Sequence, residues 1–280
     1  MNRLGEEYIT SGEFAKMTGV NKQTLLFYDK IRLFTPAFVD GQGYRYYTVS
    51  QMDNFFTILA LKTIGMSLDE IKNYIDARTP ETTLDLFQKY REKARVKIRE
   101  MEILSREMKK RCELIEKAKE VSCGEIYIEH HEKQFIQSGS YIPENATAME
   151  RYTSMKEVIK YRLENQLHCG HAIGGMVEKA FFENPAGDKT KYCRYFTVID
   201  NPEDDKGNME KPAGNYLVLY YRGSYNTTYL TYGQILQYAE KHNMKLGDYM
   251  YEESLIDEIS ERNSQNYITQ IMIPFSFYAS

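Results

Sequence analysis

The longest uninterrupted helical pattern in the chain runs from Glu81 to about Lys119 and contains neither glycine nor proline. At ~1.5 Å per residue it predicts a helix close to ~60 Å long. Its apolar positions recur every seven residues with charged residues beside them, the pattern of a coiled coil: Phe87, Ala94, Met101, Met108 and Ile115. The alternative is a helix lying on the core of its own domain. Since so narrow a stripe is hard to bury in one small domain, we favour the coiled coil.

Charge changes sign at the end of this helix. Residues 1–120 carry 21 basic and 18 acidic side chains, and residues 121–280 carry 15 and 22. Such a division predicts a front half that faces an anionic partner and an acidic back half that favours cationic ligands. With 280 residues the chain has room for two domains.

The cysteines and the hydropathy restrict the compartment. The four cysteines, at positions 112, 123, 169 and 193, form no CxxC motif and no disulfide framework. No run approaches ~18 apolar residues, and the N-terminus has no signal-peptide pattern. We therefore expect a cytoplasmic protein with free thiols and no membrane partner.

The segment from Ser11 to Tyr47 reads as two short helices followed by a hairpin. Gly19 separates the helices, and Asn21 can cap the second one. The second helix begins with Lys22, Gln23 and Thr24, which suit groove edges and phosphates. This layout predicts a winged helix-turn-helix whose second helix enters the major groove of DNA.

The stretch LLFYDKIRLFTPAFVDGQGYRYY resembles the signature of MerR-type transcription regulators. Leu26 and Phe27 depart from it, standing where the family usually has arginine and often has tyrosine. The resemblance implies an antiparallel coiled-coil homodimer that binds double-stranded promoter DNA and lets RNA polymerase engage a distorted promoter. The expected DNA-binding residues are Lys22, Gln23, Thr24, Tyr28, Tyr44, Arg45, Tyr46 and Lys62.

Residues 121–280 contain two successive blocks of strand, helix, strand and strand. The first block begins with the strand 134–141, and the second begins with the strand 216–222 about 80 residues later. A duplicated βαββ unit places two helices on one antiparallel sheet with a groove between the halves. The overall expectation is an α+β protein with three parts: a DNA-binding domain over 1–78, a dimerisation helix over 79–120, and an effector domain over 121–280.

The segments AGNYLVLYYRGSYNTTYLTYGQIL and YEESLIDEI resemble the GyrI-like effector-binding domain. With the MerR-type head, the whole chain is similar to the multidrug-sensing regulators of that family. This half holds 17 of the 24 tyrosines, whose rings attract cations. The resemblance places Glu252, rather than the adjacent Glu253, in the groove as the carboxylate for an aromatic, cationic effector. Tyr152, Tyr225, Tyr229 and Gln270 are expected around it.

Other functions have weaker support in the sequence. Cys112 and Cys123 lie 11 residues apart without a Cys/His cluster, so we expect no metal site and no cofactor. Since some GyrI-like domains use a Glu and a Tyr to activate water, a small-molecule hydrolase is an alternative. A drug-sequestering protein is a third interpretation. We expect a regulator that is not an enzyme.

Overall fold

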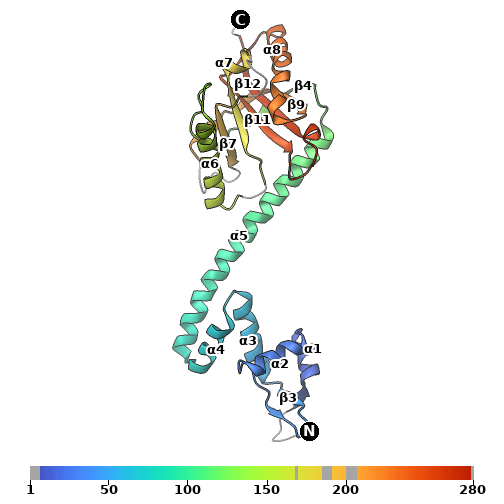
Figure 1. Cartoon of the computed structure of the whole chain (residues 1–280), viewed down its shortest axis with the longest axis vertical. Coiled ribbons are helices and arrows are strands. Elements are labelled where there is room, and N and C mark those ends of the chain that lie inside the picture. Colours follow the sequence, from blue (N-terminus) through green and yellow to red (C-terminus); the bar gives the residue numbers. More distant parts are fainter. Residues whose placement is uncertain (1–6, 168–169, 185–190, 200–206, 279–280) are drawn as a thin grey trace. The chain divides into compact units, whose positions relative to one another are not determined.

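The computed structural model describes residues 7–167, 170–184, 191–199 and 207–278. It divides into two compact units, residues 1–99 and 100–280, with the boundary inside the long helix α5 (Pro80–Glu120). The proposed boundaries at 78 and 120 instead follow the ends of that helix. Figure 1 labels the helices and strands of the two units.

The first unit contains two short helices, a three-stranded sheet and two further helices before α5. Its elements are β1 (Tyr8–Thr10), α1 (Ser11–Thr18), α2 (Lys22–Lys30), β2 (Phe38–Val39), β3 (Arg45–Thr48), α3 (Gln51–Thr63) and α4 (Leu68–Ala77). The strands lie in the order β1-β3-β2 and are antiparallel. Asn21 caps α2 by accepting a hydrogen bond from the amide of Gln23, as expected.

Aromatic side chains fill the core of this unit. Phe14 and Phe34 lie within ring-contact distance of each other, and each also contacts the rings of Tyr47 and Phe55; the Phe34 and Tyr47 rings stack at 5.5 Å. Since these residues come from α1, β3, α3 and the segment after α2, their packing fixes the helices against the hairpin.

The second unit is built around one curled antiparallel sheet. Its strands are β4 (Ile126–His131), β5 (Gln134–Ser138), β6 (Gly174–Glu178), β7 (Arg194–Ile199), β8 (Met209–Lys211), β9 (Gly214–Arg222), β10 (Met244–Leu246), β11 (Tyr249–Ile256) and β12 (Ile268–Phe277). Its helices are α6 (Ala148–Glu164), α7 (Lys179–Glu183), η1 (Tyr225–Thr231), α8 (Tyr232–Lys241) and η2 (Ser264–Asn266).

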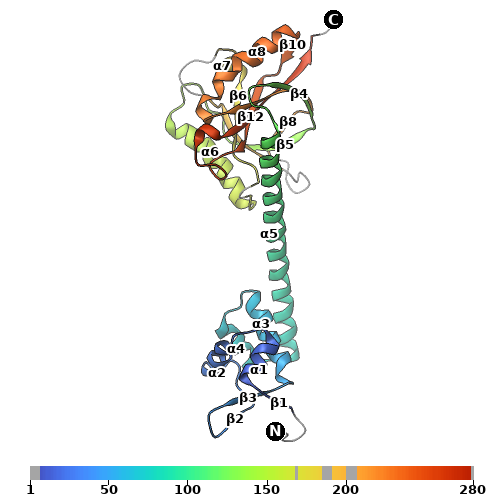
Figure 2. The same ribbon diagram turned by 90° about the vertical axis from the view of Figure 1, so that its right-hand side faces the viewer.

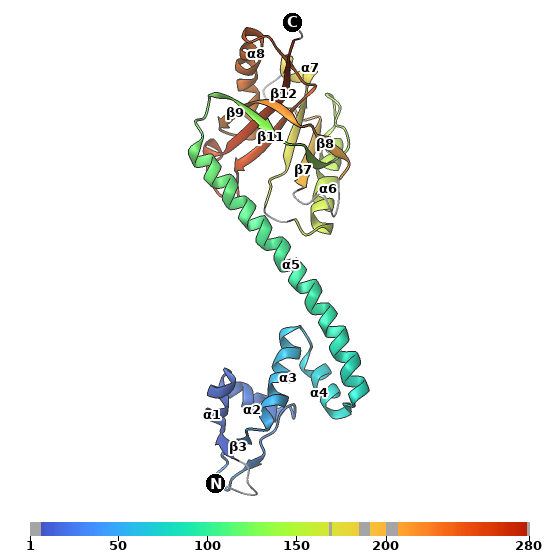
Figure 3. The same cartoon turned by 180° about the vertical axis from the view of Figure 1, so that it is seen from behind.

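The sheet confirms the predicted duplication. Its order is β4-β9-β12-β11-β6-β7-β5-β8, with β10 beside β12. The first block supplies β5, α6, β6 and β7, and the second supplies β9, α8, β11 and β12. The equivalent strands β6 and β11 pair at the centre of the sheet (Figure 3). The short strands β4, β8 and β10 and the helix α7 lie outside the predicted pattern.

The two faces of the sheet bury different clusters. Leu217, Ile235 and Ile271 belong to the cluster that α7 and α8 cover. Val218, Met272 and Ala118 of α5 belong to the cluster on the opposite face. In Figure 2, α6, α7 and α8 lie on one side of the sheet, and the end of α5 reaches the other. The groove between α6 and α8 is the place where a ligand site was predicted.

Candidate functional site

The helix-turn-helix presents polar side chains at the start of α2. Lys22 and Gln23 are exposed and Thr24 is half-buried, whereas Leu25 and Tyr28 of the same helix are buried. Tyr28, only 1% exposed, packs in the core. The prediction that Tyr28 contacts DNA is therefore not supported by the position of its ring, which is buried among the core residues.

The hairpin of β2 and β3 forms the predicted wing. Tyr44 at its tip is exposed, and the Tyr46 ring stacks on Phe38 with the centroids 4.7 Å apart. Arg45 is half-buried, and its Nε donates a 2.7 Å hydrogen bond to Oδ2 of Asp29 in α2. This ion pair links the wing to the second helix, so Arg45 positions the wing in addition to offering a guanidinium group.

Lys62 of α3 lies beside the second helix. Its Nζ is 3.5 Å from the hydroxyl of Tyr28 and 5.7 Å from the centroid of that ring. The Tyr28 ring therefore supports an exposed ammonium group next to α2. The remaining predicted DNA-binding residues carry polar side chains of the kinds that contact the DNA backbone, and their role stays a prediction: Lys22, Gln23, Thr24, Tyr44, Arg45, Tyr46 and Lys62.

A cavity of about 440 Å³ opens on the sheet face between α6 and η1. We call it the tyrosine cavity, because Tyr192, Tyr195 and Tyr225 line it together with Glu252. Met155 and Arg162 contribute from α6, and Arg111 contributes from α5. Its size lies within the range of small-molecule sites, ~300–1,000 Å³.

Glu252 lies in β11 at this cavity and is 2% exposed. Its carboxylate accepts a 2.8 Å hydrogen bond from the hydroxyl of Tyr192 and a 2.5 Å bond from that of Tyr232. Burial raises the pKa of Glu252 to about 7, although hydrogen bonds from Tyr232, Tyr192 and Thr228 oppose the shift. The site thus holds a carboxyl group that ionises near neutral pH, and the hydrogen-bonding partners of this group within the described part of the chain are uncharged hydroxyls.

A glycine in the neighbouring strand makes room for the Tyr192 ring. Gly175 pairs with Glu252 across β6 and β11, and a Cβ at Gly175 would lie 2.2 Å from that ring. Any larger residue at Gly175 would therefore displace Tyr192 from the carboxylate. The Gly174-Gly175 pair within a strand pattern was the sequence signal for such a close approach.

Glu253 occupies the opposite face of the sheet. Its Oε1 accepts a 2.8 Å hydrogen bond from Nζ of Lys211, and Lys211 also lies over the rings of Tyr216 and Tyr251. Burial raises the pKa of Glu253. The charge and the hydrogen bond of Lys211, together with other charges nearby, lower it by more, so the pKa of Glu253 lies below its ordinary value. Glu253 is therefore paired within the protein and does not line the tyrosine cavity.

The structure separates the other predicted effector residues. Tyr225 lines the cavity and its hydroxyl bonds to Glu258 at 2.5 Å. Tyr152 of α6 is 59% exposed and is not among the residues that line the cavity. Tyr229 packs against the cluster under α8.

Gln270 also lies outside the tyrosine cavity. It is the cross-strand partner of Glu253, so the two side chains share the face opposite Glu252. The predictions that Tyr152, Tyr229 and Gln270 surround the effector are thus not supported by their positions.

Sequence reasoning missed several residues of the cavity. Tyr192 and Tyr232 hold the carboxylate, and Ser254 and Thr269 lie on the floor beside it. Arg111 of α5 also lines the cavity, and its Nη1 bonds to Oδ2 of Asp257 at 3.0 Å with both side chains buried. This ion pair connects the long helix with the residue that directly follows β11, the strand that carries Glu252.

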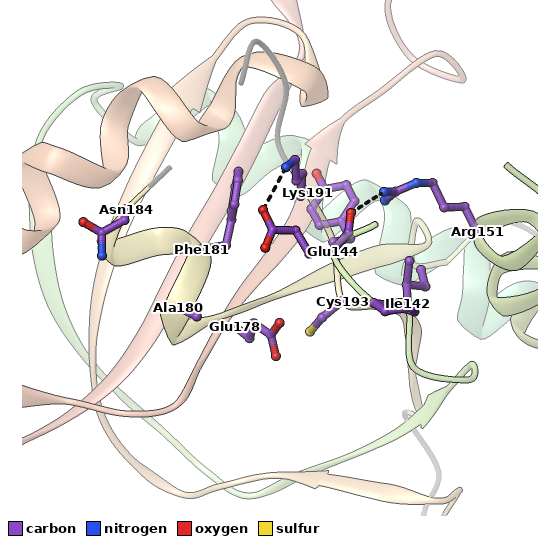
Figure 4. Close-up of a pocket in the computed structure, with 11 residues that line it drawn as sticks. Ile142, Glu144, Arg151, Glu178, Ala180, Phe181, Asn184, Lys191 and Cys193 are labelled. Carbon is purple, nitrogen blue, oxygen red and sulfur yellow. Dashed lines mark hydrogen bonds and ion pairs between the residues drawn. The ribbon is translucent and has the colours of Figure 1, made fainter. Parts of the chain in front are cut away.

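A second cavity, about 260 Å³, shares Tyr192 with the first. Figure 4 shows Lys191 and Arg151 both directed at Glu144, with Phe181 and Cys193 nearby. Lys191 Nζ lies 3.2 Å from Oε1 of Glu144, and Tyr141 donates to Glu178 at 2.9 Å. Its volume lies below the usual range of small-molecule sites, ~300–1,000 Å³, so this smaller cavity is the weaker ligand site.

No group of three or more His, Cys, Asp or Glu side chains in the described part of the chain is arranged to hold a metal ion. None of the helices described is long and apolar enough to cross a membrane.

A DNA-binding winged helix, a long helix and a domain with a ligand-sized cavity define a ligand-responsive regulator. Residues 9–78 match the MerR HTH family regulatory protein, and residues 137–276 match the GyrI-like small molecule binding domain. The chain belongs to the GyrI-like small molecule binding family and, with its MerR helix-turn-helix, is a transcription regulator of the MerR type.

Curated relatives align over almost the whole chain. The multidrug-efflux transporter 2 regulator of Bacillus subtilis is 29% identical over 275 residues, covering 96% of both chains. The multidrug-efflux transporter 1 regulator of the same organism is 26% identical over 285 residues, covering 96% of this chain and 99% of that one. The cryo-EM structure of the EcmrR–DNA complex in EcmrR-RPo matches with a TM-score of 0.40 and 19% sequence identity. The match covers 96% of this chain and 100% of that chain.

Proposed function

We propose that this protein senses aromatic, cationic small molecules in the tyrosine cavity and controls transcription of genes for a multidrug response. The observation that carries the proposal is Glu252, a buried carboxyl group among tyrosines in a ligand-sized cavity. An ionised carboxylate in such surroundings needs a positive partner, which a lipophilic cation provides. The regulators of Bacillus subtilis described above support this choice, since both are named for multidrug-efflux transporters.

The proposed mechanism is a shift between two states of a DNA-bound dimer. The effector can change promoter geometry only by the difference in its affinity for the two states. Arg111 gives a physical connection, because this residue of α5 lines the cavity and pairs with Asp257. In one state the promoter would be bent and untwisted so that RNA polymerase can engage it. The protein is proposed to act in the cytoplasm.

The homodimer is proposed to form through α5. Met101 and Met108, one heptad apart, are 50% and 54% exposed in the single chain. We expect Met101→Glu combined with Met108→Glu to convert the dimer into a monomer, because facing carboxylates would be buried in the seam. Sedimentation velocity measures this, with Lys110→Glu as the control, because this lysine lies two residues from Met108 on another face of α5. A variant that sediments as the wild-type dimer would contradict a seam through these residues.

The DNA surface is tested through Lys62. We expect Lys62→Met to weaken binding to all DNA sequences by about threefold to tenfold and to reduce the salt slope by about one unit, because one phosphate contact is lost. Fluorescence anisotropy with DNA selected from a random pool by the wild-type protein measures both quantities. Lys160→Met, an exposed lysine of α6, is the control for a general change in charge. Equal salt slopes for Lys62→Met and wild type would exclude a phosphate contact there.

A hydrolase is the second candidate, since Glu252 has a pKa of about 7 and two tyrosine hydroxyls within hydrogen-bond distance. Such a group can act as a general base. Mass spectrometry of a compound after prolonged incubation distinguishes the two functions. A regulator returns the compound unchanged, whereas a hydrolase yields a product whose formation stops in Glu252→Gln.

A further inference from the structure

The floor of the tyrosine cavity carries a row of polar groups beyond the carboxylate. Glu252 and Ser254 are two residues apart in β11, so they lie on the same face of the sheet. Thr269 of β12 is the direct cross-strand partner of Ser254 and shares that face. All three line the cavity.

Thr269 is the unusual member of this row. It is 2% exposed, and its Oγ1 has no hydrogen-bond partner among the residues that the structure describes. Buried hydroxyl groups are nearly always hydrogen-bonded, because leaving one unpaired is unfavourable. A threonine in this place in β12 makes sense where a group entering the cavity supplies the partner.

We propose that Thr269, with Ser254 beside it, is a specificity-determining hydroxyl pair that selects effectors carrying a hydroxyl or carbonyl oxygen next to an aromatic ring. This inference rests on the proposed function, since it takes the tyrosine cavity as the effector site. Two residues along a strand correspond to about 7 Å. A cationic centre at Glu252 would therefore leave the far end of an attached ring near Thr269.

The ligand class follows from the chemistry of the row. Glu252 supplies the negative charge, the tyrosines supply aromatic faces, and Thr269 supplies a group that can donate or accept. A cation with only hydrocarbon groups would leave the Thr269 hydroxyl unpaired, whereas an oxygen-bearing analogue would satisfy it.

A matched pair of probes tests the proposal. Tetraphenylphosphonium has no hydrogen-bonding group, and (4-hydroxyphenyl)triphenylphosphonium is the same cation with one hydroxyl. By isothermal titration calorimetry on the full-length protein, we expect the hydroxylated probe to bind about tenfold more tightly. Thr269→Val should abolish this preference, so that the two probes bind with the same affinity, and Thr269→Ser should retain it.

Two controls keep the outcomes distinct. Ser154→Ala removes another buried hydroxyl that lacks a partner among the described residues, but outside this cavity, and it should leave both affinities unchanged. Wild-type protein that binds the two probes equally would overturn the inference, whether or not Thr269→Val folds. If that equal binding still weakens in Glu252→Gln, the proposed effector site stands and only the role of Thr269 fails. If neither probe binds, the proposed function fails together with the inference.

Discussion

Glu252→Gln is expected to make the protein more stable above pH 7 and, at the same time, a much weaker binder of cations. In the folded protein the pKa of Glu252 is about 7, compared with an ordinary value of 4.5. Because the folded state holds this proton more tightly than the unfolded state, the stabilisation is complete below about pH 4.5 and is lost as the pH rises through about 7. A shift of this size corresponds to about 3 kcal/mol.

The glutamine variant removes this pH dependence. Its amide keeps hydrogen-bonding partners for Tyr192 and Tyr232 but carries no charge to bury. At pH 8 we expect its melting temperature to exceed that of wild type by about 5–10 °C, and at pH 4 we expect the two to agree. Differential scanning calorimetry at both pH values measures the effect. A melting difference that does not change between pH 4 and pH 8 would contradict a neutral, buried carboxyl group at Glu252.

Cation binding should change in the opposite sense. Wild-type affinity for tetraphenylphosphonium should rise about tenfold between pH 6 and pH 8, because Glu252 must lose its proton to pair with the cation. Glu252→Gln should bind about 100-fold more weakly at pH 8 and show no pH dependence. Glu258→Gln is the matched control, since Glu258 is an exposed carboxylate at the same cavity and should cost little. A larger loss of affinity in Glu258→Gln than in Glu252→Gln would show that the cation pairs with the exposed carboxylate of Glu258 and not with Glu252.

The sequence allowed the fold to be predicted because its signals are local. The helix α5 runs from Pro80 to Glu120, where an uninterrupted helical pattern indicated it. The strands β9, β11 and β12 lie where β-branched and aromatic residues cluster. The repeated sequence of strand, helix, strand and strand along the chain predicted the duplication. The spatial order of the strands in the sheet was not predicted, because it depends on pairing between segments far apart in the sequence.

Site residues could be predicted only where the alternation along a single strand decides which face of the sheet a side chain occupies. Alternation along β11 shows that Glu252 and Glu253 face opposite sides, and resemblance to the family selected Glu252. Gln270 could not be assigned in this way, because its side depends on the register that pairs it with Glu253. Tyr192 reaches the carboxylate from the segment just before β7, and Tyr232 reaches it from the first residue of α8. No sequence spacing relates either position to β11.

Lys211→Met is expected to produce the largest loss of stability among single changes considered for the second unit. Lys211 is 1% exposed, and its Nζ lies 2.8 Å from Oε1 of Glu253. Methionine would fill the space left by the lysine stem but would leave the Glu253 carboxylate buried without its main partner. Breaking a buried pair in this way costs about 3–5 kcal/mol.

The sign of the pH dependence distinguishes this mechanism from poor packing. The pKa of Glu253 is lowered in the folded protein, so its contribution is present at neutral pH and is lost as the pH falls through the folded pKa. The defect of Lys211→Met should therefore shrink at acidic pH, where Glu253 is protonated. Adding Glu253→Gln to Lys211→Met should recover most of the lost stability at pH 7, which a packing defect would not allow.

Urea unfolding followed by tyrosine fluorescence is suitable, since the chain has no tryptophan. The matched control is Lys133→Met, which breaks the exposed pair between Lys133 and Glu210 at 3.3 Å and should cost less than about 1 kcal/mol. Because Lys211 and Glu253 lie on the face opposite Glu252, the folded double variant should still bind tetraphenylphosphonium with wild-type affinity. A folded double variant that has lost cation binding would show that the effector depends on Glu253 as well, and the assignment of one carboxylate to structure and the other to the ligand would be wrong.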